Sequence, residues 1–179
     1  MADFPDGLRQ PDQRSCGAAC LVAAHGLRNP GYEEQVDSQT RFSAEVLAMH
    51  RRVTSPSDVA GRMQLPWPRM FGTPPWAVER QLAASWDRPY ATQLVRGTDR
   101  AATFARLAGA AAPAGLYVGS GWLPRHVVLV LDGDDEALRV YEPAGGRVER
   151  VDRDRFTAGE LSLGGWDVAW FVIVPDVTR

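Results

Sequence analysis

The sequence predicts an α+β domain in which helices come first and an antiparallel sheet follows. In the first half of the 179-residue chain, apolar side chains recur with helical spacing. The second half instead contains short runs rich in β-branched and aromatic residues, which favour strands. No repeat, linker or low-complexity tract interrupts the chain, so we expect a single domain over residues 1–179.

The expected helices cover residues 16–25, 40–52, 57–63, 75–85 and 99–110. Ser15 is a good N-cap for the first helix, and Gly26 is expected to stop it after a run of small and apolar residues. The segment 65–76 is dense in proline and aromatic residues and is expected to be an irregular loop. Pro74 and Pro75 in this loop suit the start of the next helix.

The expected strands cover residues 90–95, 115–119, 126–131, 137–141 and 168–174. The segment Gly133-Asp-Asp-Glu136 has the composition of a hairpin turn between two of them. With a three-residue loop over 133–135, the facing pairs are Asp132 with Glu136, Val130 with Leu138, Val128 with Val140, and His126 with Glu142. Because side chains alternate along a strand, these four pairs share one face of the sheet.

The composition excludes several classes of function. The formal net charge is −2 and all 20 basic residues are arginine, so we expect no nucleic-acid partner and no Schiff-base lysine. No apolar run approaches the roughly 20 residues that span a bilayer, and the N-terminus lacks the features of a signal peptide. We therefore expect a cytoplasmic protein without a membrane segment, in which both cysteines are reduced.

Cys16 is the strongest candidate for chemistry, because it stands in the first turn of a predicted helix within Gln10-Pro-Asp-Gln-Arg-Ser-Cys16-Gly-Ala-Ala-Cys20-Leu. Unpaired N–H groups and the positive end of the helix dipole favour a thiolate there, the form of cysteine that attacks carbonyls. Gly17 is expected to leave room for a substrate against the backbone. Cys20, one helical turn later, is expected to pack in the core.

An acyl-transfer site also needs a base, a group that orients the base, and hydrogen-bond donors for the oxyanion. Pairing across the hairpin makes His126 the candidate base and Glu142 the candidate orienting acid. Gln10 lies six residues before Cys16, so its side-chain amide is the candidate that shares the oxyanion with the Cys16 backbone N–H.

This order of residues resembles the C39 cysteine peptidases and C39-like proteins of the papain-like superfamily. The resemblance covers residues 10–27 and 114–148, and it rests on Gln10, Cys16-Gly-Ala-Ala-Cys-Leu, His126-Val-Val-Leu and Glu142-Pro-Ala-Gly-Gly146. It implies a papain-like fold with an N-terminal active-site helix packed on an antiparallel sheet. It also implies four roles: oxyanion support by Gln10, nucleophile for Cys16, base for His126 and orienting acid for Glu142.

Two features depart from the family pattern. The family usually has aspartate where this chain has Glu142, so the carboxylate reaches one methylene further. No transmembrane or nucleotide-binding segment follows, unlike in exporter-fused members that cut leaders after a double glycine. A stand-alone hydrolase is therefore implied, and leader cleavage does not transfer with the resemblance. The chain's own double glycines, Gly145-Gly146 and Gly164-Gly165, are expected to be turns.

The expected function is hydrolysis of an amide bond in a peptide or protein substrate through an acyl-enzyme on Cys16, without metal or organic cofactor. Two alternatives keep the site but change the reaction, to a transglutaminase-like acyltransferase or to a deamidase. A third alternative is a non-catalytic peptide-binding module. A zinc site built from Cys16, Cys20 and His25 is disfavoured because its spacing is atypical and a fourth ligand is missing. His50, beside two arginines, is expected to be solvated.

Overall fold

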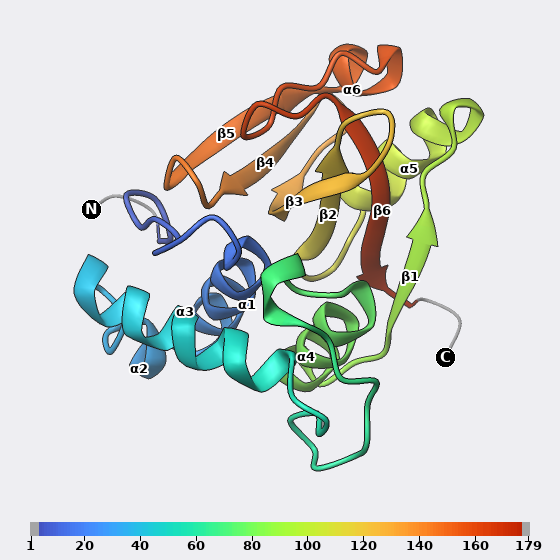
Figure 1. Cartoon of the computed structure of the whole chain (residues 1–179). Coiled ribbons are helices and arrows are strands. Elements are labelled where there is room, and N and C mark those ends of the chain that lie inside the picture. The colour runs from blue at the N-terminus through green and yellow to red at the C-terminus, as the bar shows by residue number, and fades with distance from the viewer. Residues whose placement is uncertain (1–3, 177–179) are drawn as a thin grey trace.

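A six-stranded antiparallel sheet forms the middle of the structure, a computed structural model that describes residues 4–176 (Figure 1). The strands lie in the order β1-β6-β2-β3-β4-β5. Their bounds are β1 (Tyr90–Leu94), β2 (Ala114–Gly119), β3 (Pro124–Gly133), β4 (Ala137–Glu142), β5 (Arg147–Asp152) and β6 (Val168–Pro175). Each neighbouring pair runs antiparallel, as the sequence predicts.

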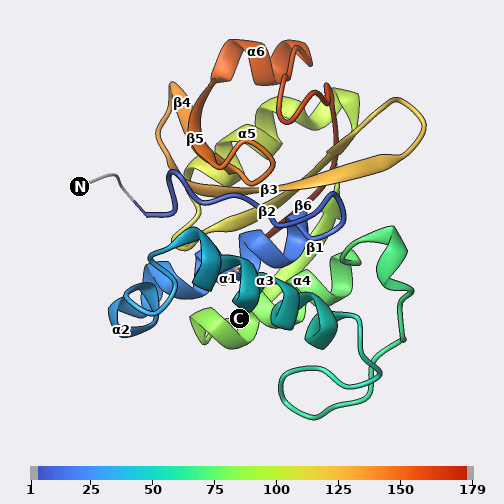
Figure 2. The same ribbon diagram turned by 60° about the vertical axis from the view of Figure 1, so that its left-hand side comes forward.

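Helices cover both faces of this sheet (Figure 2). One face carries α1 (Cys16–Arg28), α3 (Gln39–Val53) and α4 (Pro75–Trp86), with the short α2 (Pro30–Glu33) beside α1. The other face carries α5 (Arg100–Ala108) and α6 (Arg153–Ala158). The single 3₁₀ turns η1 (Arg69–Phe71) and η2 (Gly97–Asp99) precede α4 and α5. This arrangement confirms the predicted α+β class.

Side chains on β3 alternate between the two faces, as the period of two in a strand requires. Val127 and Leu129 pack in the cluster that contains α1, whereas Val128 and Val130 pack in the cluster that contains α5 and α6. The alternation continues to the start of the strand. His126 therefore follows the row of Val128 on the α5–α6 face.

One predicted helix, over residues 57–63, is wrong. The carboxylate of Asp58 accepts hydrogen bonds from the backbone N–H groups of Ala60 (2.9 Å) and Arg62 (2.8 Å). Such side-chain bonds compete with the helical ladder and hold the backbone in a loop. The segment is therefore a turn-rich excursion between α3 and α4, which Figure 1 shows as a long loop below the helices.

Helix α1 continues past Gly26 to Arg28, so the predicted stop is wrong. Gly26 is buried under Phe4, and a Cβ atom there would lie 2.6 Å from the aromatic ring. Ser15 precedes α1 as predicted, but its hydroxyl donates to the carbonyl of Asp12 (3.3 Å) instead of capping the helix. The sequence also missed α2, β5 and α6. The two helices are too short to show a period, and β5 is rich in charged residues.

The N-terminal segment 4–10 is bound to the turn that joins β4 to β5. The backbone N–H of Gln10 donates to the carbonyl of Pro143 in that turn (2.8 Å). Tyr141 on β4 is fully buried, and its hydroxyl donates to the carbonyl of Leu8 (2.7 Å). These bonds bring the chain that precedes α1 beside the end of β4.

Replacing Tyr141 with Phe should lower the free energy of unfolding by about 1–2 kcal/mol, because the buried carbonyl of Leu8 loses its donor. The matched control is Tyr32→Phe, which removes a longer and less buried bond to Glu45 (3.2 Å). We expect the control to cost less than about 0.5 kcal/mol. Urea unfolding measures both values, and equal losses would contradict a special role for the Leu8 bond.

Candidate active site

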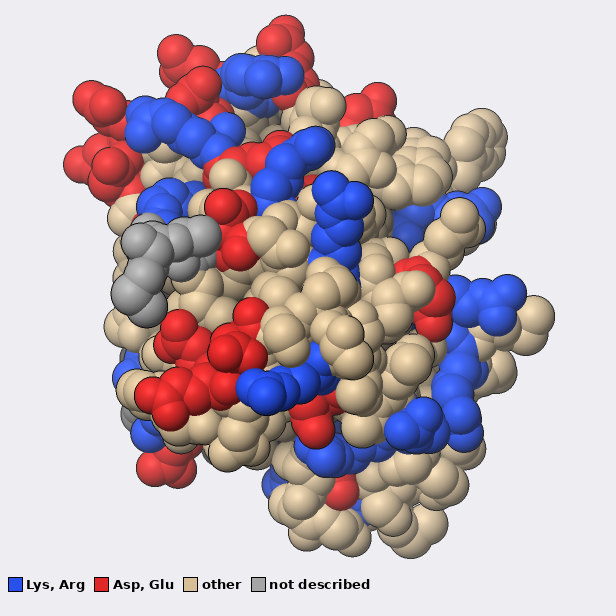
Figure 3. All heavy atoms as spheres, turned by 90° about the vertical axis from the view of Figure 1, so that its left-hand side faces the viewer, with Lys and Arg blue, Asp and Glu red and all other residues tan. Residues whose placement is uncertain are grey.

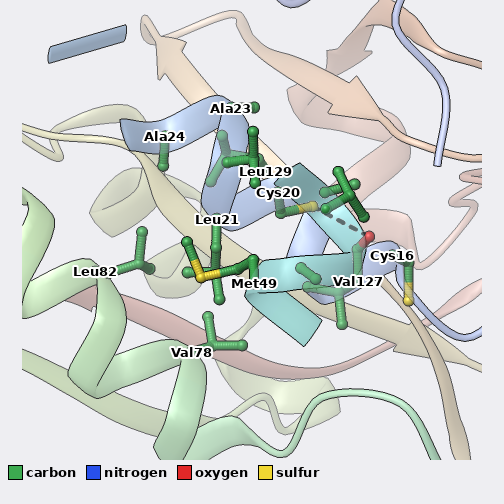
Figure 4. Close-up of a cluster of buried hydrophobic side chains, with 14 of the residues drawn as sticks. Cys16, Cys20, Leu21, Ala23, Ala24, Met49, Val78, Leu82, Val127 and Leu129 are labelled. Atoms are coloured by element: carbon green, nitrogen blue, oxygen red, sulfur yellow. Dashed lines mark hydrogen bonds between the residues drawn. The ribbon is translucent and has the colours of Figure 1, made fainter. Parts of the chain in front are cut away.

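Cys16 is the first residue of α1, and only 4% of it is exposed. Figure 4 shows it at the edge of the apolar cluster, whereas Cys20 points into the cluster. The thiol of Cys20 donates to the carbonyl of Val127 (3.4 Å), and burial raises its pKa well above the ordinary value. Core packing of Cys20 is thus confirmed, and the two thiols have different surroundings.

His126 lies near the start of β3, and Glu142 is the last residue of β4. The predicted register between these strands is wrong, because Val130 faces Val140 rather than Leu138. At Val130 and Leu129 the displacement is two residues, and an even displacement leaves the side chains of this part of the hairpin on their predicted face. His126 and Glu142 therefore still share one face, as diagonal rather than direct neighbours.

The register differs because the hairpin turn differs from the expected three-residue loop. The carboxylate of Asp134 accepts from the backbone N–H groups of Glu136 and Ala137, both at 2.8 Å, which places the turn later in the chain. Next to the turn the register is displaced by three residues, and a bulge between Val130 and Asp132 brings the displacement back to two. Neither the side-chain bonds nor the bulge is visible in the strand pattern.

His126 and Glu142 meet in a hydrogen bond of 2.7 Å between Nε2 and Oε1. Their side chains are 6% and 1% exposed. A short bond between charged partners is strong when little water screens it. Because Nε2 is engaged by Glu142, Nδ1 is the ring nitrogen that remains for Cys16.

The turn after β4 holds the carboxylate of Glu142. Its Oε1 accepts from the N–H of Ala144 (2.8 Å), and its Oε2 accepts from the N–H of Gly145 (2.6 Å). Burial favours the neutral acid, but the bonds from His126 and from these two N–H groups outweigh it and lower the pKa of Glu142. The longer side chain of glutamate thus bends back onto its own turn and still reaches the imidazole.

Opposing effects set the ionisation of His126. Burial lowers its pKa, but hydrogen bonds to Cys16 and Glu142, together with the charges of both, raise the pKa to about 9. His126 is therefore protonated at neutral pH, whereas Glu142 is ionised. Cys16, His126 and Glu142 lie together in one site, which joins the start of a helix to the ends of two strands.

Gln10 lies next to this site, but its side chain is already engaged. Its Nε2 donates to the carbonyl of Asp12 (2.7 Å), and its Oε1 is buried without a hydrogen-bond partner among the described residues. An amide nitrogen carries two hydrogens, so one N–H of Gln10 remains beyond the bond to Asp12. The oxyanion role of Gln10 stays a prediction.

Thr73 is a residue near the nucleophile that sequence reasoning missed. A Cβ atom on Gly17 would lie 2.7 Å from Cβ and 2.8 Å from Oγ1 of Thr73. The space expected for substrate above Gly17 is therefore occupied by Thr73. Its hydroxyl is buried without a hydrogen-bond partner in the described chain, and its carbonyl accepts from Tyr117 (2.7 Å). Nothing in the sequence links Thr73 to Cys16, since the two meet only through folding.

His50 is buried, with 6% exposed, so the expectation of a solvated side chain is wrong. It faces the segments around Asp12 and Gly72, because α3 packs on α1 beside the chain that precedes Cys16.

A groove of about 590 Å³, lined in part by Leu27 and Trp86, lies at the opposite end of α1 from Cys16.

The described residues show neither a metal centre nor a spanning helix. No group of three or more His, Cys, Asp and Glu side chains in residues 4–176 is arranged to hold a metal ion. Within the same range, every helix is too short or too polar to cross a bilayer. On the face seen in Figure 3, acidic side chains gather in groups on the left, and the arginine side chains of the described chain are separated by other residues rather than joined into one basic surface.

The chain resembles several solved structures in its three-dimensional arrangement. No protein-family model and no curated protein matches the chain. A C39-like peptidase candidate from Bacillus anthracis aligns over 100% of this chain and 98% of its own, at 10% identity and a TM-score of 0.50. The peptidase domain of Streptococcus ComA, a bifunctional ABC transporter involved in quorum sensing, aligns over 94% and 97%, at 16% identity and a TM-score of 0.46. The Pseudomonas avirulence protein AvrPphB aligns over 89% of each chain, at 12% identity and a TM-score of 0.47.

At these identities the likeness is one of fold. The alignment over the whole chain at a TM-score of 0.50 carries it, and the order of helices before an antiparallel sheet agrees with it. The chain has the fold of this C39-like peptidase candidate, which agrees with the fold that its sequence predicts.

Proposed function

We propose that the chain is a thiol-dependent hydrolase that cleaves an amide bond of a peptide or protein through an acyl-enzyme on Cys16. The observation that carries this proposal is the buried 2.7 Å bond between His126 and Glu142, next to a cysteine at the start of a helix. Proteins with the same fold can catalyse different reactions. The peptidase-like fold therefore supports amide hydrolysis but does not by itself assign that reaction to this chain.

The first half of the reaction starts with His126 protonated, because its pKa is about 9. The imidazolium and the first N–H groups of α1 favour the thiolate of Cys16, which attacks the scissile carbonyl carbon. As the S–C bond forms, the carbonyl oxygen becomes an oxyanion that accepts from the Cys16 N–H and the remaining N–H of Gln10. His126 then gives its proton to the amine nitrogen, and the C–N bond breaks.

The second half hydrolyses the acyl-enzyme. Neutral His126 takes a proton from water, and the water oxygen attacks the acyl carbon. The S–C bond breaks, the carboxylic acid leaves, and Cys16 returns to the thiolate while the proton remains on the imidazole. Glu142 stays ionised throughout and holds the ring by Nε2, which leaves Nδ1 as the nitrogen that exchanges protons with Cys16 and the substrate.

The rival enzymatic reactions use the same acyl-enzyme and differ in the bond cleaved or the acceptor. An amine in place of water gives a transamidated product and releases ammonia from a glutamine donor. Water acting on a glutamine side chain raises the substrate mass by about one unit, whereas peptide hydrolysis creates new termini. Product masses therefore separate the three reactions.

Replacing Cys16 with Ala should abolish turnover, with a loss on the order of 10³-fold or more, because no acyl-enzyme forms. The matched control is Cys20→Ala, which removes the other thiol and should leave activity within about threefold of wild type. The assay incubates each protein with a library of peptides in ¹⁸O-labelled water and reads new C-termini by mass spectrometry. Iodoacetamide labelling of the wild type should modify Cys16, at the edge of the apolar cluster, and spare Cys20, which points into the cluster.

Two results would contradict this mechanism. The first is wild-type turnover in Cys16→Ala. The second is slow, equal labelling of both thiols in the wild type, together with measurable peptide affinity, which would favour a non-catalytic binding module.

Shortening Glu142 to Asp should lower kcat/KM by about 10- to 100-fold, although the charge is kept. The carboxylate is held by the N–H groups of Ala144 and Gly145, so a shorter side chain cannot reach both this turn and His126. Glu142→Gln should cost more, about 10²- to 10⁴-fold, because the negative charge that stabilises the imidazolium is lost. Steady-state kinetics on a cleaved peptide compares the two variants.

The pH profile tests the same pair. Loss of the proton from His126 should make wild-type kcat/KM fall as pH rises through about 9, and in Glu142→Gln this alkaline limb should move to lower pH. A limb that stays in place in Glu142→Gln would contradict the orienting role of Glu142. Full activity of Glu142→Asp would contradict the dependence on the longer side chain.

A further inference from the structure

A tight turn over residues 163–166 lies between α6 and β6. Leu163 and Trp166 exchange backbone hydrogen bonds in both directions, each of 3.0 Å. The two central residues, Gly164 with φ 57° and Gly165 with φ 83°, adopt the left-handed conformation that a type I′ turn requires. The turn expected at this double glycine is confirmed.

The inner side of this turn rests on the bond between His126 and Glu142. A Cβ atom on Gly164 would lie 2.8 Å from Cδ2 and 2.9 Å from Nε2 of His126. The same atom would lie 3.1 Å from Oε1 of Glu142. Nε2 and Oε1 are the two atoms that share the 2.7 Å hydrogen bond, so the backbone of Gly164 lies directly over it. Gly165 has no such neighbours, because a Cβ atom there would meet nothing within 4 Å.

The apolar core on the α5–α6 face holds the turn in place. Leu161 and Leu163 are buried in the same cluster as Phe156 of α6, and Trp166 packs against that cluster. The distance between Gly164 and the pair is therefore set by core packing on both sides of the turn.

We propose that Gly164 is a positioning residue of the candidate active site, whose bare backbone seals the bond between Nε2 of His126 and Oε1 of Glu142 against water. An effect of this seal on catalysis rests on the proposed function as a hydrolase. Water at the bond would compete for both partners and screen their charges. With water excluded, the bond holds the imidazole in one orientation, with Nδ1 toward Cys16. Any side chain at position 164 must displace the turn, the ring or the carboxylate.

The first test uses the wild-type protein with ¹⁵N-labelled histidine. Proton NMR should show that the N–H at Nε2 of His126 exchanges with water at least about 10-fold more slowly than the ring N–H of His25. His25 is the internal control, because its ring is only partly buried. Equal exchange rates would show that water reaches the bond and would overturn the proposal.

The second test compares Gly164→Ala with Gly165→Ala. Both variants place alanine at a positive φ and so carry a similar backbone cost, but only the first puts a methyl group against the pair. We expect Gly164→Ala to lower kcat by about 100-fold with little change in KM. A misplaced imidazole slows the chemical steps, whereas substrate binding does not depend on its orientation. Exchange at His126 should rise to the rate of His25. Gly165→Ala should stay within about twofold of wild type in both readouts.

Equal losses in the two variants would assign the effect to backbone strain and overturn the proposal, as would wild-type exchange and kcat in Gly164→Ala. If Gly164→Ala does not fold, the wild-type exchange rate alone decides. Failure of the proposed function gives a different result, because slow exchange at His126 without any amide hydrolysis would contradict the hydrolase and leave the seal intact.

Discussion

The hydrogen bond between His126 and Glu142 is the interaction on which the arrangement of the candidate site depends. Removing a proton donor and an acceptor from water is costly unless both are fully paired, and a carboxylate has more acceptor positions than one imidazole can fill. The N–H groups of Ala144 and Gly145 occupy two of the others. The bond is therefore possible in a buried place because the turn after β4 completes it.

The candidate nucleophile reaches this pair from the other layer of the molecule. Cys16 begins a helix that packs on one face of the sheet, whereas His126 belongs to the row of side chains on the opposite face. They meet at the end of the sheet. The bonds from the N-terminal segment to Pro143 and Tyr141 hold the start of α1 at that end. The site thus depends on the hydrogen bonds that hold the start of α1 against the end of the sheet.

Two glycines allow close packing around the site because they have no side chain. Gly17 lets Thr73 pack on the first turn of α1, and Gly164 lets a backbone turn lie on the pair of His126 and Glu142. In each case a methyl group would meet atoms nearer than 3 Å. Close packing around reactive groups excludes water, which strengthens every electrostatic interaction among them.

The sequence by itself determined the α+β class, most of the long helices and strands, and the meeting of Cys16, His126 and Glu142. Periodicity and strand composition suffice for these, because both reflect which face of an element is buried. The pairing of His126 with Glu142 followed from alternation along the hairpin, and it survived an error in register because that error was even.

Tertiary structure alone decided the rest. The register depended on the side chain of Asp134 and on a bulge, the loop at 57–63 on the bonds of Asp58, and the burial of His50 on the packing of α3. The contacts of Thr73 with Gly17, and of Gly164 with His126, join residues 56 and 38 positions apart in the chain. No local pattern encodes such contacts, because they arise only when layers already formed from local preferences pack against one another.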